Sequence, residues 1–260
     1  MTDIIYFVVI FVATAIGSLA GIGGGVLIKP IFDAFGEYTA SEVSVLSSSA
    51  VFAMSFISVL ISIPSVRAQK EQLKFMLPLA VGASFGGWFG DFVFSKTATN
   101  DSLIKIVQNS LLMLLIIFVI IYMRNENSKS FRKREWHTAA ITGIALGATS
   151  AFLGIGGGPI NVAVITLVFG LEIKTAVLGS LITILFAQGT KLIHLAVKGI
   201  AAFEIKLLPY VIAAGILGAL TGRMLNKTAS NKVVRQIFIT VQVMIIILCL
   251  FNIIKYGAYI

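Results

Sequence analysis

Two glycine-rich pentapeptides have the clearest capacity for binding chemistry in this chain. Gly21-Ile22-Gly23-Gly24-Gly25 recurs as Gly154-Ile155-Gly156-Gly157-Gly158, 133 residues later in a chain of 260. Each glycine inside a helix costs about 1 kcal/mol relative to alanine, so both stretches should interrupt helices. The N–H groups freed by such a break, with the positive end of the helix that follows, favour binding of an anion. The alternative is that the glycines only allow helices to pack closely.

Three polar residues in one apolar segment could contribute to the same anion site. Gln188, Lys191 and His194 are spaced by three, so they share one face of a helix. We expect Lys191 to be the only basic residue inside a membrane span, where it could neutralise an anion, and the imidazole could relay a proton. The alternative is that Lys191 extends towards its helix end, close to Lys198.

Hydroxyl and amide groups near the glycine clusters are further candidate ligands. Serines of membrane helices often bond their own backbone or a neighbouring helix, whereas the amide of Asn161 would be costly to leave unpaired. The complete predicted substrate site consists of Gly21, Gly23, Gly24, Gly25, Ser48, Gly154, Gly156, Gly157, Gly158, Asn161, Ser180, Gln188, Lys191 and His194.

No arrangement of residues typical of an enzyme or a metal site is found in the sequence. The chain has one cysteine and two histidines, no pair of carboxylates inside the apolar segments, and no phosphate-binding loop of the Walker type. We therefore expect no catalytic residues, no metal and no cofactor.

The composition indicates a membrane protein with several spans. Hydrophobic residues make up 58% and charged residues 12% of the chain, well below the roughly 25% charged residues of soluble domains. The first residues lack the basic region of a cleavable signal peptide, so we expect the first apolar segment to remain in the mature chain. The net charge of +9 is attributed mainly to cytoplasmic loops, and it also suits an anionic substrate.

The expected elements are helices only, arranged as two related halves. We expect a first repeat over 1–123, a basic cytoplasmic linker over 124–136 and a second repeat over 137–260. The apolar segments lie at about 4–20, 26–35, 43–63, 75–94, 103–123, 137–153, 159–171, 175–197, 207–222 and 236–254.

Other matches support the internal duplication. Val45–Ser49 parallels Val177–Leu181, and the glycine pair at 86 and 90 parallels the pair at 218 and 222, both at a displacement of 132. Pro78 and Pro209 are also in corresponding positions. Blocks in the same order at nearly constant displacement indicate a repeat. The glycine pairs themselves are typical of close helix packing.

The membrane topology depends on what each glycine break does. If the helices around it fold back as a hairpin, each half crosses the membrane three times and the halves are inverted. If they form one continuous span, each half crosses four times. The hairpin arrangement divides Lys and Arg thirteen against six between the two sides, and the continuous arrangement eleven against eight. The positive-inside rule therefore favours hairpins, with the linker in the cytoplasm and both termini outside.

The glycine clusters resemble the duplicated GxGGGxLxxPxL signature of the TauE/SafE sulfite-exporter (TSUP) family. The resemblance is clearest in residues 21–31 and 154–158, in the segment 77–90, and in the helix that holds His194 with Gly199 after it, and it runs over essentially the whole chain. It implies a multi-pass transporter of the bacterial or archaeal inner membrane for sulfur-containing anions such as sulfite and sulfonates, usually an exporter. In the second copy, Val162 and Ala163 replace Lys29 and Pro30.

The functional hypothesis is a secondary transporter that works by alternating access around a midplane site formed by both breaks. The expected partners are a small anion and the lipid bilayer, with no nucleic acid, while proton coupling and a homodimer are left open. The alternatives are a passive anion channel and a membrane accessory subunit without transport activity.

Overall fold

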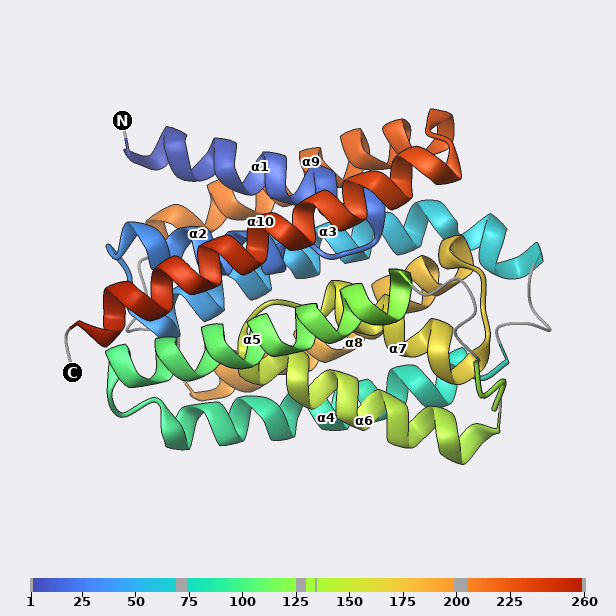
Figure 1. Cartoon of the computed structure of the whole chain (residues 1–260), viewed down its shortest axis with the longest axis horizontal. Helices are drawn as coiled ribbons and strands as arrows, with labels where there is room; N and C mark the ends of the chain where they lie inside the picture. The colour runs from blue at the N-terminus through green and yellow to red at the C-terminus, as the bar shows by residue number, and fades with distance from the viewer. Residues whose placement is uncertain (1, 69–73, 125–129, 134, 199–204, 259–260) are drawn as a thin grey trace.

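The computed structural model describes residues 2–68, 74–124, 130–133, 135–198 and 205–258 (Figure 1). Regular structure within these residues is helical throughout, so the predicted all-helical class is confirmed. Residues 125–129 and 134 of the expected linker lie outside the described residues. The helices are α1 (Thr2–Ala20), α2 (Gly25–Phe35), α3 (Ala40–Ala68), α4 (Met76–Thr97), α5 (Asp101–Arg124), α6 (Trp136–Leu153), α7 (Gly158–Phe169), α8 (Ile173–Lys198), a short 3-10 helix (Ile205–Leu207), α9 (Leu208–Thr228) and α10 (Asn231–Gly257).

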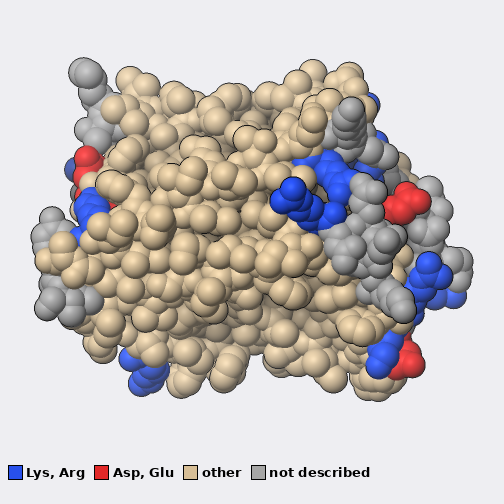
Figure 2. Space-filling view, viewed as in Figure 1, with Lys and Arg blue, Asp and Glu red and all other residues tan. Residues whose placement is uncertain are grey.

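Six helices of the described chain are long and apolar enough to cross a membrane. An apolar helix of about 20 residues matches the thickness of the hydrocarbon core. Figure 2 shows a broad face without Lys, Arg, Asp or Glu, with charged side chains gathered towards the two ends of the molecule. The uncharged band is the surface that suits contact with lipid. The six candidate spans lie within α3, α4, α5, α8, α9 and α10.

The first glycine cluster separates two helices that fold back on each other. Helix α1 ends at Ala20 and α2 begins at Gly25. The ring of Tyr6, near the start of α1, lies 4.7 Å from that of Phe32 and 5.8 Å from that of Phe35, near the end of α2. Because the beginning of one helix contacts the end of the next, α1 and α2 form a hairpin.

The second cluster separates α6 and α7, which also form a hairpin. The backbone N–H groups of Phe131 and Lys133, which precede α6, donate hydrogen bonds to the carbonyl groups of Leu167 and Val168 at 2.8 and 2.9 Å. These carbonyls belong to the last turn of α7, where no later residue of the helix can bond them. The end of α7 therefore lies beside the start of α6.

The long helices run between two ends of the molecule. Figure 1 places both termini at one end, with α3, α5 and α9 running away from it and α4, α8 and α10 running towards it. The loop between α1 and α2 points inwards from the terminal end, and the loop between α6 and α7 points inwards from the opposite end. The first five and the last five helices thus follow similar paths in opposite directions.

The two groups of five helices are interleaved through glycine contacts. A β-carbon built on Gly86 of α4 would lie 2.1 Å from the carbonyl oxygen of Ile144 in α6, and one on Gly222 of α9 would lie 2.1 Å from that of Ala15 in α1. Only glycine permits so close an approach of two backbones. The glycine pairs in α4 and α9 therefore serve helix packing, as their spacing predicts.

Candidate functional site

The two glycine breaks lie against each other in the interior. A β-carbon on Gly25 would lie 2.4 Å from the carbonyl oxygen of Ile155, and one on Gly23 would lie 3.7 Å from the Cα of Gly158. Ser180 of α8 links both breaks, because its hydroxyl lies 3.2 Å from the carbonyl oxygen of Gly21 and 3.4 Å from that of Gly158. The breaks thus form one region in which α2 and α7 both begin.

Gly157 shows why the second break needs glycine. Its φ of +75° lies in the left-handed region, which side chains with a β-carbon rarely adopt. A β-carbon there would also lie 1.9 Å from the hydroxyl of Ser150 and 2.7 Å from Oδ1 of Asn161. The bare backbone of Gly157 therefore allows these two polar side chains to lie directly against it.

Several polar side chains in this region are buried without a partner. Asn161 is fully buried, and both atoms of its amide group have no hydrogen-bond partner among the described residues. The same holds for the hydroxyl of Ser150, which lies beside Gly157 with Asn161, and for that of Ser47, which lies beside Gly25. Unpaired buried polar groups are costly, so each requires a reason such as a ligand or water.

Two more of the predicted site residues share this property. The hydroxyl of Ser48 and both amide atoms of Gln188 are buried and have no hydrogen-bond partner in the described part of the chain. Of the predicted hydroxyl donors, only Ser180 is committed to the backbone of the breaks. Ser48 and Gln188 therefore retain free hydrogen-bonding capacity in the interior.

Two polar residues of the second break have no polar counterpart at the first. At the displacement of 133 residues that relates the two clusters, Gly17 corresponds to Ser150 and Ile28 corresponds to Asn161. Neither Gly17 nor Ile28 has a polar side chain. The amide of Asn161 and the hydroxyl of Ser150 are therefore present at the second break only.

Lys191 brings a positive charge to the second break. Its side chain is 1% exposed, and Nζ donates hydrogen bonds to the hydroxyl of Ser44 at 2.5 Å and to the carbonyl oxygen of Ala151 at 3.2 Å. Ser44 also lies 2.8 Å from the place that a β-carbon of Gly154 would take. Lys191 therefore points inwards, and the alternative in which it extends towards Lys198 is wrong.

His194 lies one turn further along α8 and pairs with a carboxylate. Its Nδ1 is 2.8 Å from Oδ2 of Asp91 in α4, and the ring of Trp88 meets it edge-on at 6.4 Å. Asp91 is 2% exposed, whereas the His194 side chain is 17% exposed. His194 thus connects a buried carboxylate with the outer part of the helix bundle.

The family of the chain follows from its full sequence. Residues 6–249 match the family described as sulfite exporter TauE/SafE. The chain belongs to this family. The resemblance seen in the glycine clusters is thereby confirmed. No curated protein matches the chain at a significant level. Since TauE/SafE is a family of transporters and the structure has six candidate spans, this TauE/SafE protein is a multi-pass membrane protein of a transporter family.

Asp91 of this TauE/SafE protein was not among the predicted site residues. A carboxylate in an apolar segment is rare and signals a function or a partner. Asp91 should therefore have been recognised as a candidate, although its pairing with His194 depends on the packing of α4 against α8.

A second buried charge pair was also missed. Lys29 and Asp33 of α2 are 2% and 0% exposed, with Nζ 3.1 Å from Oδ2. Asn109 of α5 donates a hydrogen bond to the same carboxylate oxygen at 3.1 Å. Asn252 of α10 bonds Oδ1 of Asn109 at 3.2 Å and the carbonyl oxygen of Pro30 at 2.9 Å. This network joins the first hairpin to α5 and α10.

The expectation that Lys191 is the only basic residue inside a span is therefore wrong. Lys29 is buried in α2 and Lys105 is buried in α5, where its Nζ bonds Asp101 at 2.7 Å and the carbonyl oxygen of Tyr38 at 2.8 Å. Both lysines are among the six basic residues that the hairpin arrangement placed on the side of the membrane opposite the linker. Their partners lie on the same helix or on a neighbouring one, which allows a cation to remain buried.

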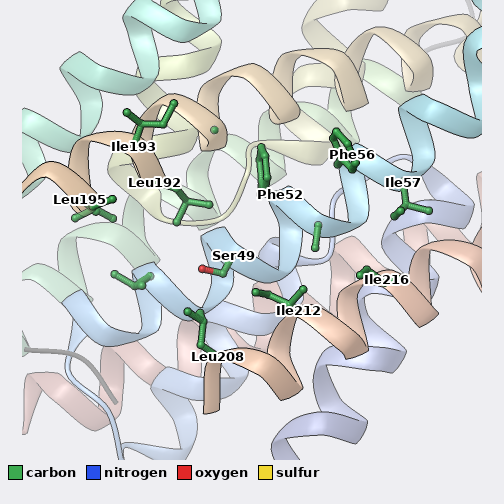
Figure 3. Close-up of a pocket in the computed structure, with 14 residues that line it drawn as sticks. Ser49, Phe52, Phe56, Ile57, Leu192, Ile193, Leu195, Leu208, Ile212 and Ile216 are labelled. Carbon is green, nitrogen blue, oxygen red and sulfur yellow. The ribbon is translucent and has the colours of Figure 1, made fainter. Parts of the chain in front are cut away.

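A separate cavity lies between α3, α8 and α9 (Figure 3). It has a volume of about 680 Å³, and its lining is apolar except for Ser49. Phe52, Ile57, Leu192 and Ile212 are among the side chains that face it. Such a lining offers an anion a single hydroxyl and no positive charge, so this cavity is not the candidate anion site. Ser49 thus faces a different space from the predicted ligands.

Proposed function

We propose that this TauE/SafE protein is a secondary transporter of small sulfur-containing anions such as sulfite or organosulfonates, with outward movement as its main direction. The anion would bind between the two glycine breaks, at the start of α7. The protein would operate in the plasma membrane, the inner membrane of a bacterial or archaeal cell, with both termini outside.

The unpaired amide group of Asn161 is the observation that carries this proposal. Asn161 lies in the first turn of α7, where backbone N–H groups and the helix dipole favour negative charge. Its amide nitrogen is buried without a partner beside Gly157, and the hydroxyl of Ser150 lies next to it. Lys191 lies at the same break through Ser44 and Ala151. An oxyanion would provide acceptors for these donors.

The arrangement of the helices supports alternating access by two inverted repeats, 1–123 and 137–260. Corresponding helices run in opposite directions, and each hairpin enters from a different end of the molecule (Figure 1). In transporters of this kind, discontinuous helices meet at the centre of the bilayer. We assign the breaks to that position, where a small rotation would open the site to one side at a time.

Replacement of Asn161 by leucine tests the proposal because it separates stability from transport. Leucine removes two unpaired buried polar atoms, so the free energy of unfolding should rise by about 1–3 kcal/mol. Sulfite flux into proteoliposomes should nevertheless fall at least tenfold. The measurements are thermal unfolding in detergent and saturable flux of sulfite at a series of concentrations.

Gln242→Leu is the matched control. Gln242 is fully buried in α10 with both amide atoms unpaired in the described chain, and α10 does not form the breaks. This variant should gain stability and keep its flux. Unchanged flux in Asn161→Leu would refute the site. A non-saturating, ohmic current in the unmodified protein would indicate a channel, and the absence of any flux would indicate an accessory subunit.

A further inference from the structure

Asp91, His194 and Lys191 form a group of titratable side chains beside the second break. Asp91 is hydrogen bonded to His194 at 2.8 Å, and it is also the opposite charge that acts on Lys191. An ionised carboxylate has no hydrogen to donate and acts only as an acceptor. In the pair with Asp91, Nδ1 of His194 therefore carries the hydrogen, and Nε2 is left to bind a proton. His194 is the most exposed of the three, with 17% of its side chain exposed.

The other elements around this group contribute no further titratable partner in the described contacts. Lys191 faces Ser44 of α3, the backbone of Ala151 in α6 and the ring of Phe94 in α4, and His194 faces Asp91 and Trp88 of α4. Helix α7 contains no titratable side chain. The like charge that acts on Lys191 is that of Lys29, which is itself paired with Asp33.

The charges of this group do not balance an anion unless a proton is added. The positive charge of Lys191 is offset by the negative charge of Asp91, and the pair of Lys29 and Asp33 is neutral as a whole. An anion bound at the break with neutral His194 would therefore leave a net negative charge in the interior, which is costly away from water. One proton on Nε2 of His194 restores neutrality for a monovalent anion.

We propose that Asp91 and His194 form a proton-binding site that loads this transporter with one proton for each monovalent anion. The proposal rests on the transport function proposed above and adds the coupling ion. The proton binds to Nε2 of His194, the imidazolium is held by the carboxylate of Asp91, and no covalent bond to the substrate changes. Anion and proton then cross together, so outward movement requires an outward anion gradient that exceeds any inward proton gradient.

Sulfite binding to the full-length protein in detergent micelles tests this coupling. Titration calorimetry in buffers of different ionisation enthalpy measures the protons taken up per bound anion. At pH 8 the unmodified protein should take up about one proton more than His194→Gln, which lacks the imidazole. The two proteins meet the same mixture of sulfite ions, so protons exchanged by sulfite itself cancel in this comparison. Between pH 8 and pH 6 its affinity for sulfite should rise by up to about tenfold per pH unit relative to that variant.

Asp91→Asn provides the opposite change. With Asp91 neutral, Lys191 alone balances a monovalent anion. At pH 8 this variant should therefore bind sulfite at least as tightly as the unmodified protein, and it should take up fewer protons on binding. Equal proton uptake in the unmodified protein and His194→Gln would overturn the coupling alone. If Asp91→Asn is lost to aggregation, His194→Gln decides. A protein that neither binds nor moves sulfite would overturn the transport function together with the coupling.

Discussion

Gly158 and Ile22 meet through backbone atoms alone. A β-carbon built on Gly158 would lie 1.3 Å from the carbonyl oxygen of Ile22 and 1.8 Å from its carbonyl carbon. Neither atom belongs to a flexible side chain, so the contact cannot be relieved by a change of rotamer. The loop of the first hairpin and the first turn of α7 therefore depend on each other for their positions.

Gly158→Ala should destabilise the protein because its methyl group would overlap the Ile22 carbonyl. We expect a loss of at least about 1–3 kcal/mol in the free energy of unfolding, the usual cost of overpacking, and a loss of transport. Thermal unfolding in detergent measures the first effect. Gly257→Ala is the control, since a β-carbon there would meet nothing within 4 Å. Equal melting temperatures for the two variants would contradict the contact.

Lys191→Met should weaken anion binding while keeping the length of the side chain. A hydrogen bond to a charged group contributes about 1.5–3 kcal/mol, so the affinity for sulfite should fall about 10- to 100-fold. Isothermal titration measures the affinity. Lys96→Met is the matched control, because Lys96 is exposed and contacts the ring of Phe92 at 6.0 Å. If both variants bind sulfite alike, Lys191 is not a ligand.

The Lys29 and Asp33 pair should show strong coupling in a double-mutant cycle. Lys29→Met or Asp33→Leu alone leaves an uncompensated buried charge, which should destabilise the protein by about 3–5 kcal/mol. The double variant removes both charges and should recover a large part of that loss. Unfolding curves of the four proteins provide the coupling energy. Additive losses would mean that the two side chains act independently.

Cysteine labelling tests the orientation in the membrane. In a Cys249→Ala background, Gly257→Cys should react on intact cells with a maleimide that cannot cross the membrane, because Gly257 is exposed at the end of the molecule that holds both termini. Ser130→Cys, at the opposite end, should react only after permeabilisation. The reverse pattern would invert the topology. Reaction of neither position from outside would favour four crossings in each half.

The helices and their interruptions could be predicted from local sequence. The apolar segment 26–35 is bounded by glycine on its N-terminal side, and the structure has α2 over Gly25–Phe35. The segment 75–94 became α4 over Met76–Thr97, with its glycines against α6. These features depend on residue type and spacing within one segment. Helix positions and breaks can therefore be read from one sequence without knowledge of the packing.

The partners of the polar residues could not be predicted in the same way. Ser150 was not recognised because one hydroxyl in an apolar helix has no distinctive spacing, yet it lies beside Gly157. Asn252 is more than 140 residues away from Asn109 along the chain, but the two side chains are bonded. Such pairs arise from the order in which helices pack. A single sequence has no local signal for that order.

Close contacts of α4 with α6, and of α1 with α9, have a mechanical consequence. Each hairpin packs closely against a helix of the other group of five, so neither group can rotate as a rigid body by itself. A moving body must combine helices from both sides of the chain's midpoint. If the polypeptide were cut between α5 and α6, the two pieces should stay assembled and purify together.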